Sequence, residues 1–224
     1  MKAPSIFLFS LLISLTSCKS YYSAKNFKEV AEAHQTIAVV PFEVYTTGQL
    51  PKEITEEQIK AVETYESKAF QISFYNKILN RNRLSGPSIP VNIQHYNKTL
   101  RILKDNNISI TDSWEKSPEL LANLLGVDAI VTGRIEKQRY FSDELSAGID
   151  IGTSILNQLG VRQVPDVSRN NKNVIADFSV LDSTTGRVLW SINYQCQADW
   201  QQQADQIISR INHRSSKHFP YRIN

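Results

Sequence analysis

Cys18 is the residue whose surroundings point most clearly to chemistry. It follows Leu15, Thr16 and Ser17, so one branched apolar residue and two small residues stand before a thiol. A deprotonated thiol is a strong nucleophile, which a lipid donor can alkylate. Small side chains ahead of it fit the narrow cleft of a peptidase. The spacing therefore predicts that the chain is cut before Cys18 and that this cysteine is modified.

The residues before Cys18 form a short apolar run. A lysine precedes the run, which extends from Ile6 to Leu15, and Lys19 follows the cysteine. A helix needs about 20 apolar residues to cross a bilayer, so this run is too short to span a membrane. One positive charge and a short apolar core are typical of a secretory signal. Residues 1–17 are therefore expected to be an export signal that is removed.

The segment Leu15-Thr16-Ser17-Cys18 resembles the bacterial lipobox. The resemblance implies a diacylglyceryl group on the thiol of Cys18 and acylation, for example by palmitate, of the amine that cleavage creates. Several acyl chains on one residue anchor a protein firmly to a membrane. An ordinary signal peptide with a chance cysteine is the alternative. Lys19, with no acidic run after it, favours the outer membrane and its periplasmic side.

The composition is that of an ordinary globular protein. Of 224 residues, 41% are hydrophobic and 21% are charged, and the net charge is +3. This charge is too small to indicate nucleic-acid binding, so no nucleic acid is expected as a partner. The sequence holds neither a P-loop nor a Gly-x-Ser-x-Gly motif, so no cofactor and no enzyme activity are expected.

Hydrophobic periodicity predicts elements in the order β-α-α-α-β-β-β-α. The strands are expected at 37–42, 127–135, 174–181 and 188–194, and the helices at 55–82, 93–103, 118–125 and 200–211. Interleaved helices and strands that end in a hairpin predict an α/β fold, with a mixed sheet layered with helices. The chain is expected to divide into the signal, a lipidated tether, one periplasmic domain with an insert, and a basic tail, at 1–17, 18–35, 36–212 (insert 139–173) and 213–224.

Three segments in this order resemble the periplasmic domain of the CsgG family of curli secretion lipoproteins. They are IAVVPF at 37–42, ELLANLLGVDAIVTGRI at 119–135 and ADFSVLDSTTGRVLWSINY at 176–194. LpoB-like activators of penicillin-binding proteins share this fold, and the N-terminal domain of TolB is similar. The resemblance implies a single domain of this type that is not an enzyme and that works by binding partners.

The insert 139–173 is the expected partner-contact element. Apolar and small or polar residues alternate along it, and its candidate contact residues are Ile149, Ile151 and Ile155. The alternation has about the length of a tilted membrane strand, so a membrane hairpin is one interpretation and a surface loop or soluble hairpin is the other. A CsgG subunit has a second membrane hairpin before its closing helix. Here the corresponding gap, 195–199, is too short for one.

Other reactive residue types favour structural roles. Asp182 opens the turn Asp-Ser-Thr-Thr-Gly and is expected to cap it. Cys196 is expected to be a small buried residue, with a reactive thiol as the alternative. His34 and His95 have no visible partner in the sequence.

These observations predict an outer-membrane lipoprotein with a non-catalytic, partner-binding periplasmic domain that assists envelope assembly or secretion. Its expected partners are the membrane, through the lipid anchor, and other envelope proteins. The alternatives are a subunit of a ring-forming, curli-type secretion channel, which would be a homo-oligomer, and an activator of a peptidoglycan synthase.

Overall fold

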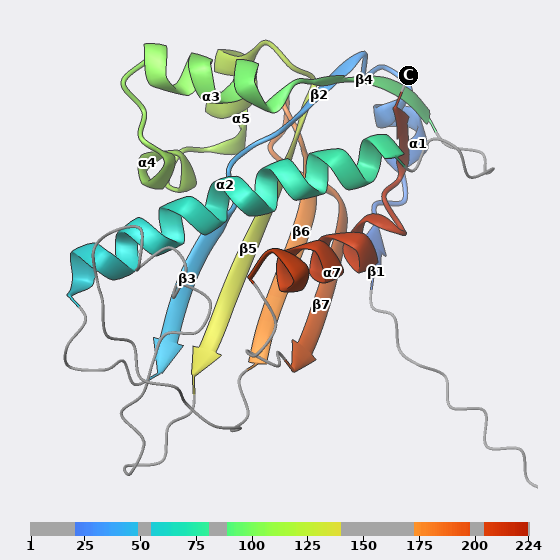
Figure 1. Ribbon diagram of the computed structural model, residues 1–224. Helices are drawn as coiled ribbons and strands as arrows, with labels where there is room; N and C mark the ends of the chain where they lie inside the picture. Colours follow the sequence, from blue (N-terminus) through green and yellow to red (C-terminus); the bar gives the residue numbers. More distant parts are fainter. Residues whose placement is uncertain (1–20, 49–54, 81–88, 140–172, 198–203, 224) are drawn as a thin grey trace, which may run out of the picture.

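The computed structural model describes residues 21–48, 55–80, 89–139, 173–197 and 204–223. Within these residues eight strands form one mixed sheet in the order β1-β7-β6-β5-β2-β4-β8, and β3 pairs with β5 beyond the end of β2 (Figure 1). The strands are β1 Tyr21–Ser23, β2 Thr36–Val39, β3 Glu43–Gly48, β4 Ile89–Gln94, β5 Ala129–Arg139, β6 Asn173–Asp182, β7 Val188–Gln197 and β8 Tyr221–Ile223. The predicted α/β class, a mixed sheet layered with helices, is confirmed.

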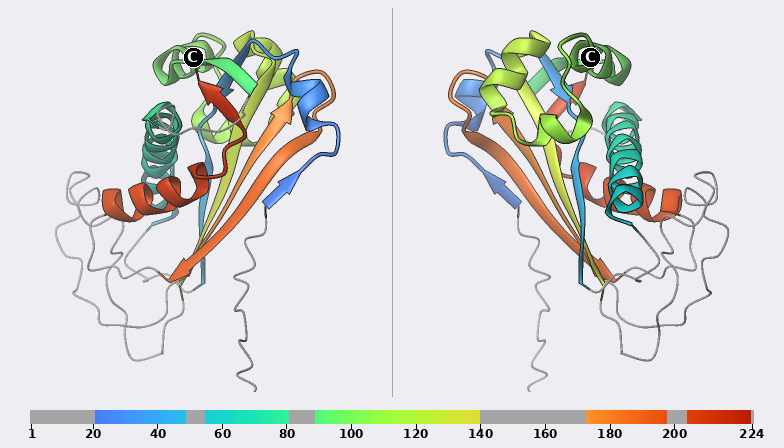
Figure 2. Two further views of the ribbon diagram at one scale, coloured as in Figure 1. Left: turned by 90° about the vertical axis from the view of Figure 1, so that its right-hand side faces the viewer. Right: turned by 90° about the vertical axis from the view of Figure 1, so that its left-hand side faces the viewer.

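Helices cover the two faces of the sheet unequally. They are α1 Phe27–Ala31, α2 Glu56–Asn80, α3 Tyr96–Asp105, α4 Ile110–Trp114, α5 Pro118–Leu125 and α7 Ala204–Ser216. The long helix α2 and α7 lie across one face, whereas α3, α4 and α5 gather at the upper end of the molecule (Figures 1 and 2).

The capping residues that the sequence shows around α5 act as expected. The Ser117 side chain accepts a hydrogen bond from the N–H of Leu120, and Pro118 occupies the first turn. Gly126 ends the helix in the left-handed conformation, at φ 65° and ψ 47°. A glycine adopts this conformation without the steric cost of a β-carbon. These signals explain why the helix occupies 118–125 as predicted.

Two hydrophobic cores follow from the alternation of side chains along the strands. The larger core lies between the sheet and helices α2 and α7 and contains Phe42, Phe74, Phe178 and Trp190. The smaller core joins α3 and α5 to the other face of the sheet through Val40, Leu103, Leu121, Leu125, Ile130 and Leu181. From the central strands β5 and β6, the smaller core takes only Ile130 and Leu181.

Strand β3 lies between the predicted strand at 37–42 and the predicted helix at 55–82, where no element was expected. Strands β2 and β3 both run parallel to β5, with Val39 opposite Val131 and Glu43 opposite Arg134. Pro41 has no N–H to give to the ladder and stands between them. The two strands thus follow one edge of β5 with a break at 40–42.

The ends of the domain differ from the predicted boundaries. Residues 21–34, expected to belong to a tether, form β1 and α1, and β1 pairs with β7. The segment 213–224, expected to be a basic tail, completes α7 and adds β8, which pairs with β4. Phe219, Tyr221 and Ile223 are buried there. A three-residue strand has too little periodicity to be seen in a sequence, which explains both differences.

Candidate functional site

Below the smaller core the second face of the sheet is mainly polar, with the half-buried Ile175 of β6 opposite Glu136. Its side chains come from alternate positions of β3, β5, β6 and β7, which point away from α2 and α7. Among the described elements, helices lie over this face only at its upper end (Figure 2). We call this surface the open face; it comprises Glu43, Tyr45, Thr47, Thr132, Arg134, Glu136, Gln138, Asp177, Ser179, Ser191, Asn193 and Gln195.

Glu136 organises the β3–β5 side of the open face. Its carboxylate accepts hydrogen bonds from the Tyr45 hydroxyl (3.1 Å), the Thr47 hydroxyl (3.0 Å) and the Gln138 amide (3.0 Å). The hydrogen bond from Gln138, followed by those from Thr47 and Tyr45, holds the pKa of Glu136 below its ordinary value. Burial and the bond to Glu136 raise the pKa of Tyr45. The group is therefore a fixed array with an ionised carboxylate at its centre.

Arg134 links this array to the upper part of the face. Its Nε lies 3.3 Å from a carboxylate oxygen of Glu43, and its guanidinium lies 4.8 Å from the centre of the Tyr45 ring. On the neighbouring strands, the Asn193 amide donates to Asp177 over 2.7 Å. The exposed polar groups thus hold one another in defined positions, which lowers the entropy that a partner must remove on binding.

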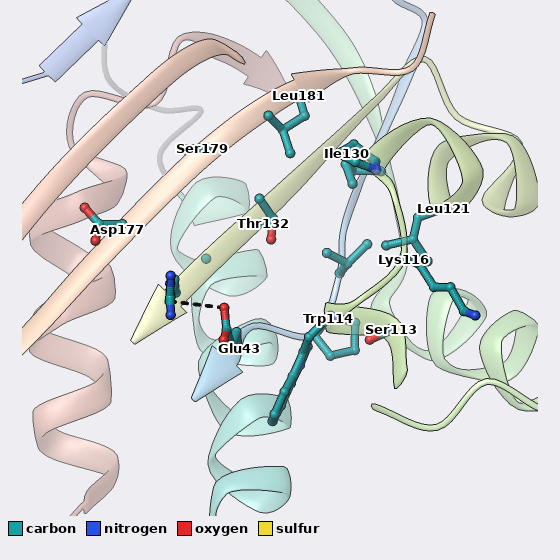
Figure 3. Close-up of a pocket in the computed structure, with 15 residues that line it drawn as sticks. Glu43, Ser113, Trp114, Lys116, Leu121, Ile130, Thr132, Asp177, Ser179 and Leu181 are labelled. Carbon is teal, nitrogen blue, oxygen red and sulfur yellow. Dashed lines mark ion pairs between the residues drawn. The ribbon is translucent and has the colours of Figure 1, made fainter. Parts of the chain in front are cut away.

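A hollow of about 310 Å³ lies where the open face meets the smaller core (Figure 3). Leu121, Ile130 and Leu181 contribute apolar surface, and Trp114 of α4 forms a wall beside Glu43. The Nε1 of Trp114 is buried and has no hydrogen-bond partner. The hollow combines an apolar base, an aromatic wall and a charged rim, a composition found in sites that bind other molecules.

A second hollow, of about 590 Å³, lies between α2 and α7. Tyr65, Ile72 and Ile208 line it together with Lys68 and Lys77. Among the described residues, its lysines lack the network of hydrogen bonds and ion pairs that fixes the polar side chains of the open face. It is therefore the weaker of the two candidate surfaces and serves below as a comparison.

The structure does not describe the site residues that the sequence predicted. Cys18 and the contact candidates Ile149, Ile151 and Ile155 all lie outside the described residues, so both assignments stay predictions. The ends of the predicted insert are described: β5 and β6 pair as far as Gln138 opposite Asn173. The chain between 139 and 173 therefore leaves and rejoins the fold beside the Glu136 array.

Two of the structural interpretations agree with the geometry. Asp182 caps its turn, since its carboxylate accepts from the N–H and the hydroxyl of Thr185 (2.8 and 2.7 Å). Burial alone would raise the pKa of Asp182, but bonds from Thr185 and His34 hold it below its ordinary value. Cys196, expected to be buried, is partly buried against the larger core, and this burial raises the pKa of its thiol. A raised pKa keeps the thiol protonated and less nucleophilic.

The residues of the open face were missed by the sequence reading. The signal that could have found them is the run of alternate polar residues Thr132, Arg134, Glu136 and Gln138 in a strand whose other face is apolar. Trp114 and Glu43 join them only through the tertiary fold, because they are distant in sequence from β6.

In the described part of the chain, no group of three or more His, Cys, Asp or Glu side chains is placed to hold a metal ion. Among the helices that the structure describes, none is both long and apolar enough to cross a bilayer.

No protein-family model matches the chain, and no curated protein matches it by sequence. Solved structures with a similar course of the chain include a PelC dodecamer from Paraburkholderia phytofirmans, at TM-score 0.41 and 11% identity, covering 91% of this chain and 96% of that one. A lipoprotein from Neisseria meningitidis gives 0.40 and 13%, covering 79% and 92%. The LpoB C-terminal domain from Salmonella enterica gives 0.39 and 10%, covering 73% and 83%.

These values are too low to assign the chain to any of those families. The resemblances to CsgG and to LpoB both stay predictions. The functional argument therefore rests on the residues of this chain.

Proposed function

We propose that this protein is an outer-membrane lipoprotein, anchored through Cys18 and facing the periplasm, that binds other envelope proteins through the open face and does no catalysis. The observation that carries the binding role is the fixed polar array around Glu136 and Arg134, beside the Trp114 hollow. A strand face that only contacts water does not need side chains that hold one another in place. A binding surface gains affinity from such a network, because less side-chain entropy is lost when a partner binds.

The segment 139–173 is part of this proposal. Its two ends join the fold beside Gln138 and Asn173, next to the Glu136 array. Ile149, Ile151 and Ile155 would then add apolar contacts to a partner that already touches the open face. Anchoring by lipid confines the protein to a thin layer and raises its effective concentration toward partners held in the same layer.

Photo-crosslinking in whole cells tests the binding role. A photoreactive phenylalanine analogue replaces Asp177 or Asn193, both exposed on the open face. Matched controls carry it at Lys104 on α3 and at Lys68 beside the second hollow. We expect discrete adducts from Asp177 and Asn193 and none from Lys104. Adducts from Lys68 alone, or none at any position, would contradict the assignment to the open face.

The identity of the captured protein separates the finer alternatives. Adducts with a second copy of the chain would favour the ring-forming channel, and their detergent-resistant assembly in native membranes would support it. Adducts with a penicillin-binding protein would favour an activator of a peptidoglycan synthase. Any other envelope protein would favour a general accessory in assembly or secretion.

A further inference from the structure

The chain enters the sheet three residues after Cys18. Strand β1 pairs antiparallel with β7, with Tyr21 opposite Ile192 and Ser23 opposite Trp190. The N–H of Ala24 then donates to the carbonyl of Leu189 over 2.8 Å. The first described residues are therefore already held by the body of the protein.

Aromatic and polar contacts fasten this segment to the C-terminal end of the chain. The Tyr21 ring stacks on the His218 ring, with centroids 5.5 Å apart and planes 3° apart. Phe27 meets the Tyr221 ring edge-on at 5.5 Å. The Nδ1 of His34 lies 2.8 Å from the Tyr221 hydroxyl. Residues 21–34 are thus attached at several points and leave little slack behind Cys18.

The short stretch of chain between Cys18 and Tyr21 limits how far the membrane can lie from β1. An extended chain advances at most about 3.6 Å per residue, so three steps from Cys18 to Tyr21 span at most about 11 Å. We propose that the surface around β1 docks directly on the lipid bilayer through Tyr21, Tyr22, Lys25 and Lys217, here called the tyrosine patch. This inference rests on the acylation of Cys18 in the proposed function.

The chemistry of the tyrosine patch suits a lipid surface. Tyr21 and Tyr22 point to opposite faces of the edge strand β1, so both can reach a bilayer that meets this edge; they are 55% and 52% exposed, although they are large and aromatic. Tyrosine has an apolar ring and a polar tip, and it is enriched where membrane meets water. Lys25, shortly after β1, and Lys217, just before His218, are both exposed. Their charges attract anionic headgroups.

Docking through β1 has a consequence for the open face. Strand β1 lies at the margin of the sheet beside β7, which itself carries Asn193 (Figure 2). A body held at a rigid edge keeps one orientation relative to the bilayer, whereas a body on a long tether takes many. Every anchored molecule would therefore present the open face at the same angle.

Spin-label depth measurements test the docking. The acylated full chain, with Cys196→Ser, is reconstituted in bilayers of phosphatidylethanolamine and phosphatidylglycerol and labelled at Lys25→Cys or, as the control, at Lys104→Cys on α3. Oxygen partitions into bilayers and nickel chelates stay in water. We expect a higher oxygen-to-nickel accessibility ratio at residue 25 than at residue 104. Equal, water-like ratios on a chain whose Cys18 is shown by mass to be acylated would overturn the docking alone.

Two further variants separate docking from mere proximity. Tyr22→Ser should lower the ratio at residue 25, whereas Tyr65→Ser, which alters a tyrosine of the same 52% exposure on α2, should leave it unchanged. A Gly-Ser linker of about 30 residues inserted after Lys19 spans about 30 Å on average. Because it lets the domain move away from the bilayer, it should also lower the oxygen-to-nickel ratio at residue 25. Equal effects of the two serine variants would overturn the role of the patch. An unmodified Cys18 would overturn both this inference and the lipid anchor of the proposed function.

Discussion

Phe42 packs its ring against the backbone of Gly133, so that a β-carbon at residue 133 would lie 2.8 Å from the ring. Phe42 is fully buried and also contacts Phe74 and Phe178, at centroid distances of 5.7 and 5.3 Å. It follows Pro41 at the break between β2 and β3. Because Gly133 has no side chain, the Phe42 ring can pack closely against β5 and hold the segment between β2 and β3 in the larger core.

Gly133→Ala is expected to overpack the core beneath Phe42. Overpacking of a well-filled core costs about 1–3 kcal/mol of unfolding free energy. Urea unfolding followed by circular dichroism measures this loss. The double variant Gly133→Ala/Phe42→Leu should lose less than the sum of the two single variants, because the smaller side chain relieves the contact. Strict additivity would show that the two residues do not interact.

Lys137→Met is expected to destabilise the protein through Glu66. The Lys137 ammonium lies 2.5 Å from a carboxylate oxygen of Glu66, and the two residues are 2% and 0% exposed. Removing one partner leaves a buried charge uncompensated, which costs about 3–5 kcal/mol. Lys137→Met/Glu66→Met should recover much of that loss in the same denaturation assay. A single variant as stable as the parent would contradict the buried pair.

Glu63→Gln is expected to stabilise the protein in a pH-dependent way. Burial raises the pKa of Glu63. The nearby charge of Lys137 and a hydrogen bond from the Thr46 N–H to the Glu63 carboxylate (2.8 Å) act in the opposite direction but do not cancel this rise. A raised pKa in the folded state means that ionising this group costs stability as the pH rises above the ordinary glutamate value. Glutamine keeps an acceptor for Thr46 without that cost.

The difference in unfolding free energy between Glu63→Gln and the parent should therefore be near zero in acid, below the ordinary pKa of glutamate, and grow in favour of the variant toward neutral pH. Thermal unfolding at a series of pH values measures it. A variant that loses stability at neutral pH would show that attraction to Lys137 outweighs the cost of burial.

Tyr221→Phe is expected to weaken the junction between the two ends of the chain. The Tyr221 hydroxyl bonds to His34 over 2.8 Å, and the other ring nitrogen of His34 lies 3.2 Å from Asp182. Leaving a buried polar group unpaired costs about 1–3 kcal/mol. Tyr22→Phe, at an exposed position, is the matched control and should change stability little. Similar, small effects of both would contradict a stabilising hydrogen bond between Tyr221 and His34.

The elements that local signals specify could be predicted from the sequence. Helix α2 lies within the range predicted for the long helix, although Glu66, Ser67 and Gln71 are buried beside its apolar residues. Helix α5 has both of its caps, and the hairpin of β6 and β7 has the turn that Asp182 opens. Strands β1 and β8 were missed because strands of three residues owe their existence to distant partners. Strand β4, at Ile89–Gln94, was missed because the helix predicted at 93–103 took in Ile93, whereas α3 begins at Tyr96. Strand β3 was missed because one of its faces is polar, which reads as a loop when β5 is not yet known to lie beside it.

The candidate site was harder to predict for the same reason. The hydrogen bonds to Glu136 join β3 to β5 and therefore depend on register, which no local pattern reveals. The Trp114 wall depends on how α4 packs against the sheet. By contrast, the prediction at Cys18 uses only adjacent residues, and it concerns a modification rather than a fold.

Intact-mass measurement of the protein taken from native membranes tests the lipid anchor most directly. We predict a chain that begins at Cys18, with a mass raised by a diacylglyceryl group and an amide-linked acyl chain, and a Cys18→Ser variant that leaves the membrane fraction. A polypeptide that retains residues 1–17, or that carries an unmodified thiol at residue 18, would contradict the anchor and the membrane docking that depends on it.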